Sequence, residues 1–425
     1  MRWPLAGVRP AVRFRAVPWA CLGLGAASLT PVALGQEALR GAVQQDRAYE
    51  SRQRTPIITP DDRMHIGPVN LFLAPTLSAE WNDNVNLSPD QPEPDFILRP
   101  QVNVGAFWPA SEYVRLNLAA GVGYAWYVEG HHENRLLITP DSNLAVDLPV
   151  KDVVVTFYDQ ATYQDDLAAN AALDATRDNA NVQNTAGLRA TWMPGDWVLQ
   201  AGYAHFNYFS LTKGYEYLNR ASEQFFGRAG YALAGETRAG LEASGSMSAY
   251  DQSWRSDFYS VSFGPFLEWS ITEAVQVTAR GGYVEYISEP NAYAPPPGNV
   301  NSYYFGIEAS HQITEHLSQR LGGIRDVQVG TTSAYLEQLT VHYDLRWAFT
   351  DFAQLSAGVT YEHGQEPRNQ FVEEYDRLGF SIGLSYQLTQ RLSSTLAYRY
   401  ARRDSNLPGQ EYQQNSVTLS AAYRF

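Results

Sequence analysis

The chain ends in the stretch Val-Thr-Leu-Ser-Ala-Ala-Tyr-Arg-Phe, residues 417–425, in which two kinds of position alternate. The odd-numbered residues from 417 to 425 are apolar or aromatic, whereas the even-numbered ones are small or polar. Successive side chains of a β-strand point to opposite faces, so this alternation predicts a strand with one apolar face. If the rest of the chain repeats the pattern, the protein is all-β.

The same alternation recurs along much of the chain, for example over 114–126, 339–349 and 378–388. On 378–388, apolar and aromatic side chains from Leu378 to Leu388 share one face, and glycine, serine and glutamine share the other. Such segments are about twice as long as typical strands of soluble proteins, which have about 5–6 residues. Long alternating strands are typical of transmembrane barrels, whose apolar face meets lipid.

Short and long connections alternate between these strands from residue 69 to the C-terminus. Pro, Gly or Thr beside a polar residue indicates a tight turn, and marks eight short connections, at 108–112, 148–152, 193–196, 233–236, 271–273, 313–315, 349–351 and 388–390. Nine longer polar connections lie between them, at 83–95, 128–135, 166–181, 211–219, 251–256, 289–300, 331–335, 365–376 and 404–412. Together they predict eighteen strands, with both chain ends on the short-turn side.

Residues 69–425 are therefore predicted to form one all-β domain, a single antiparallel up-and-down transmembrane β-barrel of about 18 strands in the cell outer membrane. A propeller shares the repeat length, but its blades pack four short strands, whereas each repeat here holds two long ones. The terminal strand, with Tyr423 and Phe425, is similar to the signal that the barrel-insertion machinery recognises. A periplasmic aromatic girdle is expected from the tryptophans near short turns: Trp108, Trp192, Trp197, Trp269 and Trp347.

Composition supports this prediction and excludes several other classes of protein. Charged residues make up 18% of the chain, against about 25% in ordinary soluble proteins, and aromatic residues reach 13%. No apolar run reaches the roughly 18 residues that a transmembrane helix needs. The single cysteine, Cys21, excludes a disulfide scaffold and a cysteine-based zinc site.

The N-terminal 68 residues differ from the rest of the chain. Residues 1–35 are predicted to be a signal peptide, with a basic start, an apolar stretch from Ala16 to Leu29 and small residues before Gln36. Its removal takes away four arginines and shifts the formal net charge from −14 to −18, which argues against a nucleic-acid partner. Residues 36–68 are predicted to be a periplasmic leader, partly disordered or a short helix. The favoured interpretation is a loosely ordered leader, and the alternatives are a plug of the lumen or a docking segment for a periplasmic partner.

Charged residues on the non-lipid phase of the strands are the candidate lumen lining. They are Arg115, Arg189, Arg228, Arg280, Arg346, Arg399, Asp344, His342, Glu268, Glu308 and Glu362, together with Asp147 and Glu242. Aromatic Phe107, Phe226 and Phe266 share this phase. Arginine, carboxylate and ring faces suit a sugar chain, although any wet lumen carries mutually neutralising charges. The acidic excess predicts that small anions pass poorly, unless the arginines form a local constriction.

No catalytic, metal or cofactor site is predicted. Gly379-Phe380-Ser381-Ile382-Gly383 matches a nucleophile-elbow pattern, but it lies inside an uninterrupted strand rather than on a strand-to-helix turn. The His131-His132 pair is interpreted as a solvated loop pair. Asn82, Asn84 and Asn86 have calcium-loop spacing, but Leu87 stands where such a loop needs glycine.

Two segments carry a resemblance to a known family. The run Glu80-Trp-Asn-Asp-Asn-Val-Asn-Leu-Ser-Pro89, and the closing residues 398–406 and 412–425, resemble the β-barrel porin 2 family over roughly 69–425. That resemblance implies an outer-membrane barrel associated with exopolysaccharide or capsule export. It implies polysaccharide and a periplasmic export partner as binding partners, beside outer-membrane lipid, lipopolysaccharide and the insertion machinery.

Three functions remain open from the sequence. The first is a conduit that exports an exopolysaccharide or capsular polysaccharide across the outer membrane. The second is a general diffusion porin for small solutes. The third is a structural or surface-interaction barrel whose extracellular loops matter more than its lumen.

Overall fold

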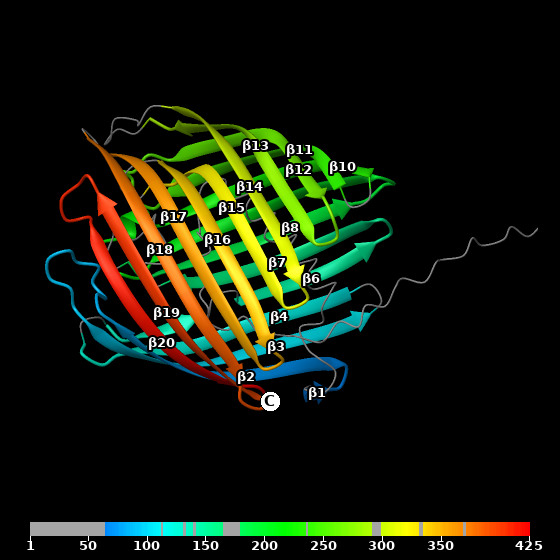
Figure 1. Cartoon of the computed structure of the whole chain (residues 1–425). Coiled ribbons are helices and arrows are strands. Elements are labelled where there is room, and N and C mark those ends of the chain that lie inside the picture. The colour runs from blue at the N-terminus through cyan, green and yellow to red at the C-terminus, as the bar shows by residue number, and fades with distance from the viewer. Residues whose placement is uncertain are drawn as a thin grey trace, which may run out of the picture.

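The chain forms one closed antiparallel barrel (Figure 1). The computed structural model describes residues 64–111, 114–130, 133–138, 142–164, 179–234, 237–290, 299–330, 335–368 and 371–425. The predicted signal peptide, most of the predicted leader and the His131-His132 pair lie outside these residues. Within them no helix has the length and hydropathy of a membrane span.

The strands follow one another in chain order around the wall. Their bounds are β1 Met64–Ile66, β2 Val69–Asn82, β3 Asp95–Ser111, β4 Val114–Tyr127, β5 Arg135–Ile138, β6 Ser142–Val150, β7 Val153–Gln164, β8 Asn181–Trp192, β9 Trp197–Ser210, β10 Arg220–Ala234, β11 Thr237–Tyr250, β12 Phe258–Ser270, β13 Val275–Ser288, β14 Val300–Thr314, β15 Leu317–Gln328, β16 Leu336–Thr350, β17 Ala353–Arg368, β18 Phe371–Gln387, β19 Leu392–Ser405 and β20 Tyr412–Tyr423. One 3-10 turn, η3 Glu216–Leu218, lies in the connection between β9 and β10.

Eighteen strand positions make up the closed wall, which confirms the predicted fold class. β5 and β6 both pair with β4, so they are two pieces of one interrupted strand position. β1 has three residues and pairs only with the start of β2, through Met64 to Leu71 and Ile66 to Val69. It lies within the segment that was expected to be a leader.

Each strand presents one side-chain phase to the lumen, and contacts between distant strands identify that phase. The Tyr304 hydroxyl of β14 donates a hydrogen bond to Glu242 of β11 at 3.2 Å, and Arg377 Nε of β18 donates to the Tyr412 hydroxyl of β20 at 3.2 Å. Side chains can reach past an intervening strand most readily on the concave side of a closed sheet, where they converge. This concave face therefore lines the lumen, and the opposite, convex face meets lipid.

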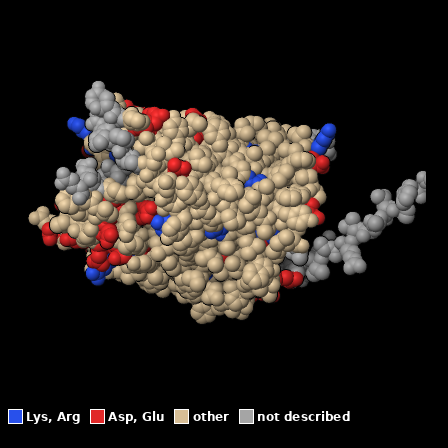
Figure 2. Space-filling view, turned by 90° about the horizontal axis from the view of Figure 1, so that it is seen from above, with Lys and Arg blue, Asp and Glu red and all other residues tan. Residues whose placement is uncertain are grey.

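The convex face is an apolar belt, which places the protein in the outer membrane. Leu77, Leu241 and Leu419 are among many large apolar side chains exposed on it. Figure 2 shows a broad band of uncharged surface, with acidic side chains gathered toward the end where Figure 1 shows the loops joining β2 to β3 and β19 to β20. The five tryptophans near short turns are all exposed on this face, as expected for a periplasmic girdle.

The barrel closes at a short seam between β2 and β20. Only seven registered pairs join them, from Thr76 with Ala422 to Asn82 with Ser416. On the periplasmic side of these pairs, the Phe425 N–H donates a backbone hydrogen bond to the Leu73 carbonyl at 3.1 Å. Pro75 stands just beyond the last pair, where its missing N–H costs no ladder bond.

The first long loop fastens the extracellular end of this seam. Asn84 is buried, and its side-chain amide donates to the Gln413 carbonyl at 2.8 Å and to the Ser88 carbonyl at 2.9 Å. Asp83 accepts hydrogen bonds from the backbone and side-chain N–H groups of Asn415, at 2.7 and 2.6 Å. The Asp-Asn element that carries the family resemblance therefore joins the first loop to the last strand.

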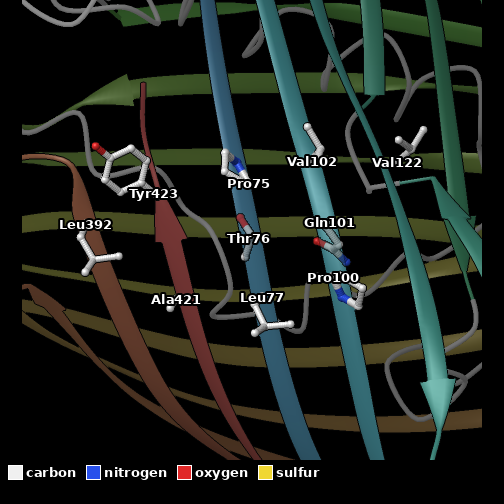
Figure 3. Close-up of a pocket in the computed structure, with 10 residues that line it drawn as sticks. All are labelled: Pro75, Thr76, Leu77, Pro100, Gln101, Val102, Val122, Leu392, Ala421 and Tyr423. Atoms are coloured by element: carbon white, nitrogen blue, oxygen red, sulfur yellow. The ribbon is translucent and has the colours of Figure 1, made fainter.

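A shallow apolar groove of about 550 Å³ lies on the convex face beside the seam (Figure 3). Leu77, Val102 and Val122 form exposed parts of its lining, next to the two prolines Pro75 and Pro100. Apart from Thr76 and Gln101, its lining residues belong to the lipid-facing phase of β2, β3, β4, β19 and β20. The groove is therefore a hollow in the lipid-facing surface and lies outside the lumen.

Candidate functional site

The concave face carries arginine and acidic side chains in comparable numbers. By register and phase, its arginines are Arg99, Arg115, Arg135, Arg189, Arg220, Arg228, Arg238, Arg280, Arg320, Arg346, Arg377, Arg399 and Arg403. Its acids are Glu80, Asp95, Asp147, Glu242, Glu268, Glu308, Asp326, Asp344, Glu362, Glu366 and Glu373. The lumen wall is thus nearly balanced in charge.

The acidic excess of the chain lies elsewhere. Strand residues on the convex phase near the extracellular end include Asp159, Glu223, Glu285, Glu337, Glu374, Asp376 and Asp404. Two of these carboxylates are each contacted by a tyrosine and a histidine of the neighbouring strand. Tyr203 and His205 contact Glu223. Tyr361 and His363 contact Asp376. The net charge of the chain therefore does not describe the charge of the lumen wall, and the poor passage of small anions stays a prediction.

A group of side chains on β10–β12 forms the densest charge network on the concave face. Arg228 lies 2.8 Å from Glu268 and 3.6 Å from Glu242, and its guanidinium stacks 3.7 Å above the centre of the Phe266 ring. Arg238 reaches the other oxygen of Glu268 at 3.1 Å. Each arginine thus meets a carboxylate one strand away, so the central cluster of Arg228, Arg238, Glu242, Glu268 and Phe266 is internally neutralised.

Glycines on the concave face let one side chain cross two strands to join this cluster. Glu242 is registered with Gly264, and Gly282 is registered with Tyr304. No side chain rises from the wall between Glu242 and Tyr304, so the phenol can lie flat and reach the carboxylate. A Cβ at Gly264 or Gly282 would meet backbone atoms at 2.0 and 2.2 Å, so only glycine fits there.

A glycine on the strand between them also lets the His342 ring lie flat and approach Glu308. A Cβ at Gly322, the position between them, would lie 2.3 Å from the His342 ring, so the ring covers this glycine. His342 Nε2 then lies 4.0 Å from Glu308, and Arg320 Nε lies 3.9 Å from the same residue. Both separations exceed the roughly 3 Å of a hydrogen bond, so the three groups form a loose set.

Two ion pairs on β17–β19 are buried instead of open to the lumen. Arg377 contacts Glu362, and both side chains are nearly inaccessible. Arg403 lies 2.7 Å from Glu373 and stacks 3.8 Å above the Tyr375 ring. Burial of paired charges fits a wall-building role, because such pairs present no free surface to a solute.

Serine hydroxyls form a further polar strip above the central cluster. Three cross-strand pairs lie at hydrogen-bond distance on β10–β12, namely Ser222 with Ser248 at 2.7 Å, Ser244 with Ser262 at 2.7 Å, and Ser246 with Ser260 at 2.6 Å. Each hydroxyl both donates and accepts, so the strip is polar without adding charge. The alternating Ser residues of 244–248 and 260–262 are visible in the sequence, but their pairing is not.

The structure places the sequence-predicted lumen residues on the concave phase but joins only some of them. Arg228, Glu242 and Glu268 meet in the central cluster, with Arg280 on the next strand, and His342 and Glu308 approach each other. Arg115 is registered with Asp147 on the neighbouring strand, and Thr156, which donates to Asp147 at 2.7 Å, is registered with Arg189 on the strand beyond. Asp344 is registered with Arg320 on the neighbouring strand, and Arg346 and Arg399 lie on the same phase of β16 and β19.

Sequence reasoning did not single out several contributing residues. Arg238, Arg320, Arg377 and Arg403 share the lumen phase of their strands, and the alternation alone could have found them. Tyr304 carries no such signal, because its role depends on two glycines in neighbouring strands. Among the described residues, no group of three His, Cys, Asp or Glu side chains is placed to hold a metal ion.

Comparisons with known proteins give structural neighbours only. No family model and no curated protein matches the chain. Pseudomonas aeruginosa OpdK, solved with vanillate, is similar over 84% of this chain and 99% of that chain, at 12% identity and a TM-score of 0.48. Acinetobacter baumannii OccAB3 covers 85% and 100%, at 10% identity and 0.49. Pseudomonas aeruginosa OpdQ covers 85% and 100%, at 11% identity and 0.49.

The geometry of the concave wall defines what it can do chemically. It offers paired charges, hydroxyls and aromatic rings inside a barrel that spans the membrane. Such a wall can bind polar solutes reversibly through hydrogen bonds and charge contacts. The candidate site is therefore the charged wall of β10–β16, built around the central cluster.

Proposed function

We propose that this barrel is a passive outer-membrane channel for small polar solutes. The observation that carries the proposal is the charge-balanced concave wall, in which arginines and carboxylates from strands one or two positions apart face a lumen that crosses the membrane. A polar interior inside an apolar barrel is the common design of diffusion channels. Balanced charge allows polar solutes to pass without trapping ions of one sign.

Burial on the concave face supports a narrow path. Glu242, Glu373 and Arg403 face inward and are nonetheless almost completely buried. An inward side chain becomes buried only when other atoms cover it, so the wall is thickened at these levels. Side chains that lie flat against glycine positions, such as Tyr304, contribute to this lining. A thickened wall favours small solutes over a polymer.

Conductance and solute uptake test the proposal directly. Purified protein in planar bilayers is expected to give stepwise channels, and proteoliposomes are expected to swell in small sugars at rates that fall steeply with sugar size. Arg402→Gln, on the exposed convex phase, serves as a matched control that leaves both readouts unchanged. Absence of conductance and of swelling would overturn the proposal.

Export of a polysaccharide is the second candidate function. It is supported by the resemblance to the β-barrel porin 2 family and by the partly exposed inward ring of Phe107, on which a sugar face can stack. Deletion of the gene separates the candidates. Loss of surface polysaccharide favours export, slower uptake of small solutes favours the diffusion channel, and no change in either favours a structural or surface-interaction barrel.

The remaining expectations belong to the same proposal. Residues 1–35 would be removed as a signal peptide, and residues 36–68, which include β1, would remain as a periplasmic leader. Tyr423 and Phe425, which lie edge to face with ring centres 4.8 Å apart, would be recognised by the insertion machinery. Outer-membrane lipid and lipopolysaccharide would surround the convex face.

A further inference from the structure

Two arginine–glutamate pairs on the concave wall remain open to the lumen. The side chains of Arg238 and Glu268 are 33% and 29% exposed, and those of Arg320 and Glu308 are 51% and 20% exposed. By contrast, the Arg403–Glu373 pair is at most 1% exposed. The open pairs are thus the charged groups that a passing solute can touch, whereas the buried pairs hold the wall together.

Strand register arranges these open groups in a single line. Arg238 is registered with Glu268, Glu268 with Thr278, and Thr278 with Glu308. The line continues through Gly322 to His342. We name this line of six residues on β11–β16 the charged row. Arg320 lies two residues from Gly322 on the same face of β15, so its guanidinium flanks the row.

Opposite charges stand on neighbouring strands at two places along the charged row, where Arg238 faces Glu268 and the flanking Arg320 faces Glu308. Neighbouring strands lie about 4.8 Å apart, so a positive and a negative group occur within one strand spacing of each other. Arg320 and Glu308 are 3.9 Å apart at their closest atoms, which is too long for a hydrogen bond. A solute that carries both charges can therefore contact both groups at once.

We infer that the charged row selects small zwitterions, solutes such as free α-amino acids that carry an ammonium and a carboxylate on one carbon. This inference rests on the proposed channel function. The carboxylate of the solute pairs with Arg320 or Arg238, and its ammonium pairs with Glu308 or Glu268. Charge-assisted hydrogen bonds then form at both ends of the solute.

A solute with a net charge binds the charged row less favourably than a zwitterion does. An anion that approaches Arg320 also approaches Glu308, and a cation that approaches Glu308 also approaches Arg320. One attraction is then offset by one repulsion over a similar distance. A neutral polyol meets neither, and gains only hydrogen bonds. The row therefore ranks a zwitterion above an anion, a cation or a neutral solute of the same size.

Four solutes built on one three-carbon skeleton test this ranking in proteoliposomes. Serine is the zwitterion, glycerate the anion, serinol the cation and glycerol the neutral solute, and the efflux of each radiolabelled compound is measured at neutral pH. We expect serine to leave through the unmodified protein several-fold faster than glycerate or serinol, relative to vesicles without protein. An equal or lower rate for serine would overturn the inference.

Paired variants locate the selectivity. Glu268→Gln with Glu308→Gln leaves Arg238 and Arg320 in place, so glycerate is expected to overtake serine. Arg238→Gln with Arg320→Gln is expected to favour serinol instead. Arg402→Gln on the convex face should keep the original ranking, and heat-dependent gel mobility reports whether each variant is folded.

The outcomes separate the inference from the proposed function. If the unmodified protein conducts but shows no preference for serine, the channel proposal stands and the charged row is not selective. If serine keeps its advantage in both folded double variants, selectivity lies elsewhere and the inference is wrong. If none of the four solutes passes and no conductance appears, the channel function itself fails.

Discussion

The substitution Glu373→Gln tests whether buried ion pairs on the concave face hold this barrel together. Glu373 on β18 and Arg403 on β19 are 2.7 Å apart, and their side chains are 0% and 1% exposed. Ser405 also donates a hydrogen bond to Glu373 at 3.0 Å. The substitution retains the size of the side chain, removes its charge and replaces one acceptor oxygen by an amide donor, so the Arg403 guanidinium loses the carboxylate that lies 2.7 Å away.

The expected loss follows from that burial. Removing one partner of a buried pair typically costs about 3–5 kcal/mol, because the remaining charge is desolvated without compensation. The stacking of Arg403 on the Tyr375 ring, at 3.8 Å, offsets part of this cost. We therefore expect a loss of about 3 kcal/mol in the free energy of unfolding.

Urea unfolding of the protein in phospholipid vesicles, followed by tryptophan fluorescence, measures this loss. The chain supplies a matched control in the next residue, because Arg402 pairs with Asp404 at 2.9 Å on the convex face, where both side chains are more than half exposed. Asp404→Asn is expected to leave the unfolding midpoint unchanged, since exposed pairs are screened by water and salt.

Two results would refute the reasoning. Equal destabilisation by Glu373→Gln and Asp404→Asn would show that burial does not set the energy of these pairs. A loss below about 1 kcal/mol for Glu373→Gln would show that the inward side chains remain hydrated. If the reasoning holds, the double variant Glu373→Gln with Arg403→Met is expected to recover part of the loss, because no unpaired charge remains.

Two further predictions concern the seam and the faces of the wall. Asn84→Ala is expected to lower the free energy of unfolding by about 1–3 kcal/mol, because the buried amide that bonds Gln413 is lost. Urea titration should show a smaller change for Asn86→Ala, whose side-chain hydrogen bonds stay within the same loop and are open to water. Equal effects would contradict the seam role. Leu241→Arg on the lipid-facing phase is expected to lower the free energy of unfolding by about 2–4 kcal/mol in the same assay. Ser244→Arg on the concave phase should lower it clearly less. The reverse order would mean that the two faces are misassigned.

Much of the fold could be predicted from local patterns. The period of two over 378–388 identifies a face because side chains of a strand alternate regardless of what surrounds them. Short turns such as 193–196 divide the strands, because turn residues act locally. The tryptophans near these turns lie on the lipid-facing side, as predicted. The interrupted position formed by β5 and β6, and the short strand β1, have no comparable signal.

The lumen could be predicted only as a set of faces. Arg228 and Glu268 share the concave phase, as predicted, but their contact at 2.8 Å depends on the register between β10, β11 and β12. A slip of two residues would keep every side chain on its face and change every neighbour. Alternation therefore carries no information on which arginine meets which carboxylate.

The sequence by itself determined the all-β class, the eighteen strand positions and the two faces of the wall, because turns and period-two alternation are local properties. Only the tertiary structure decided the charged row, the reach of Tyr304 across Gly264 and Gly282, and the fastening of Asn84 to the last strand. These features need strands far apart in the chain to meet in one register. Closure of the barrel sets that register, because every ladder, including the seam between β2 and β20, must be satisfied at once.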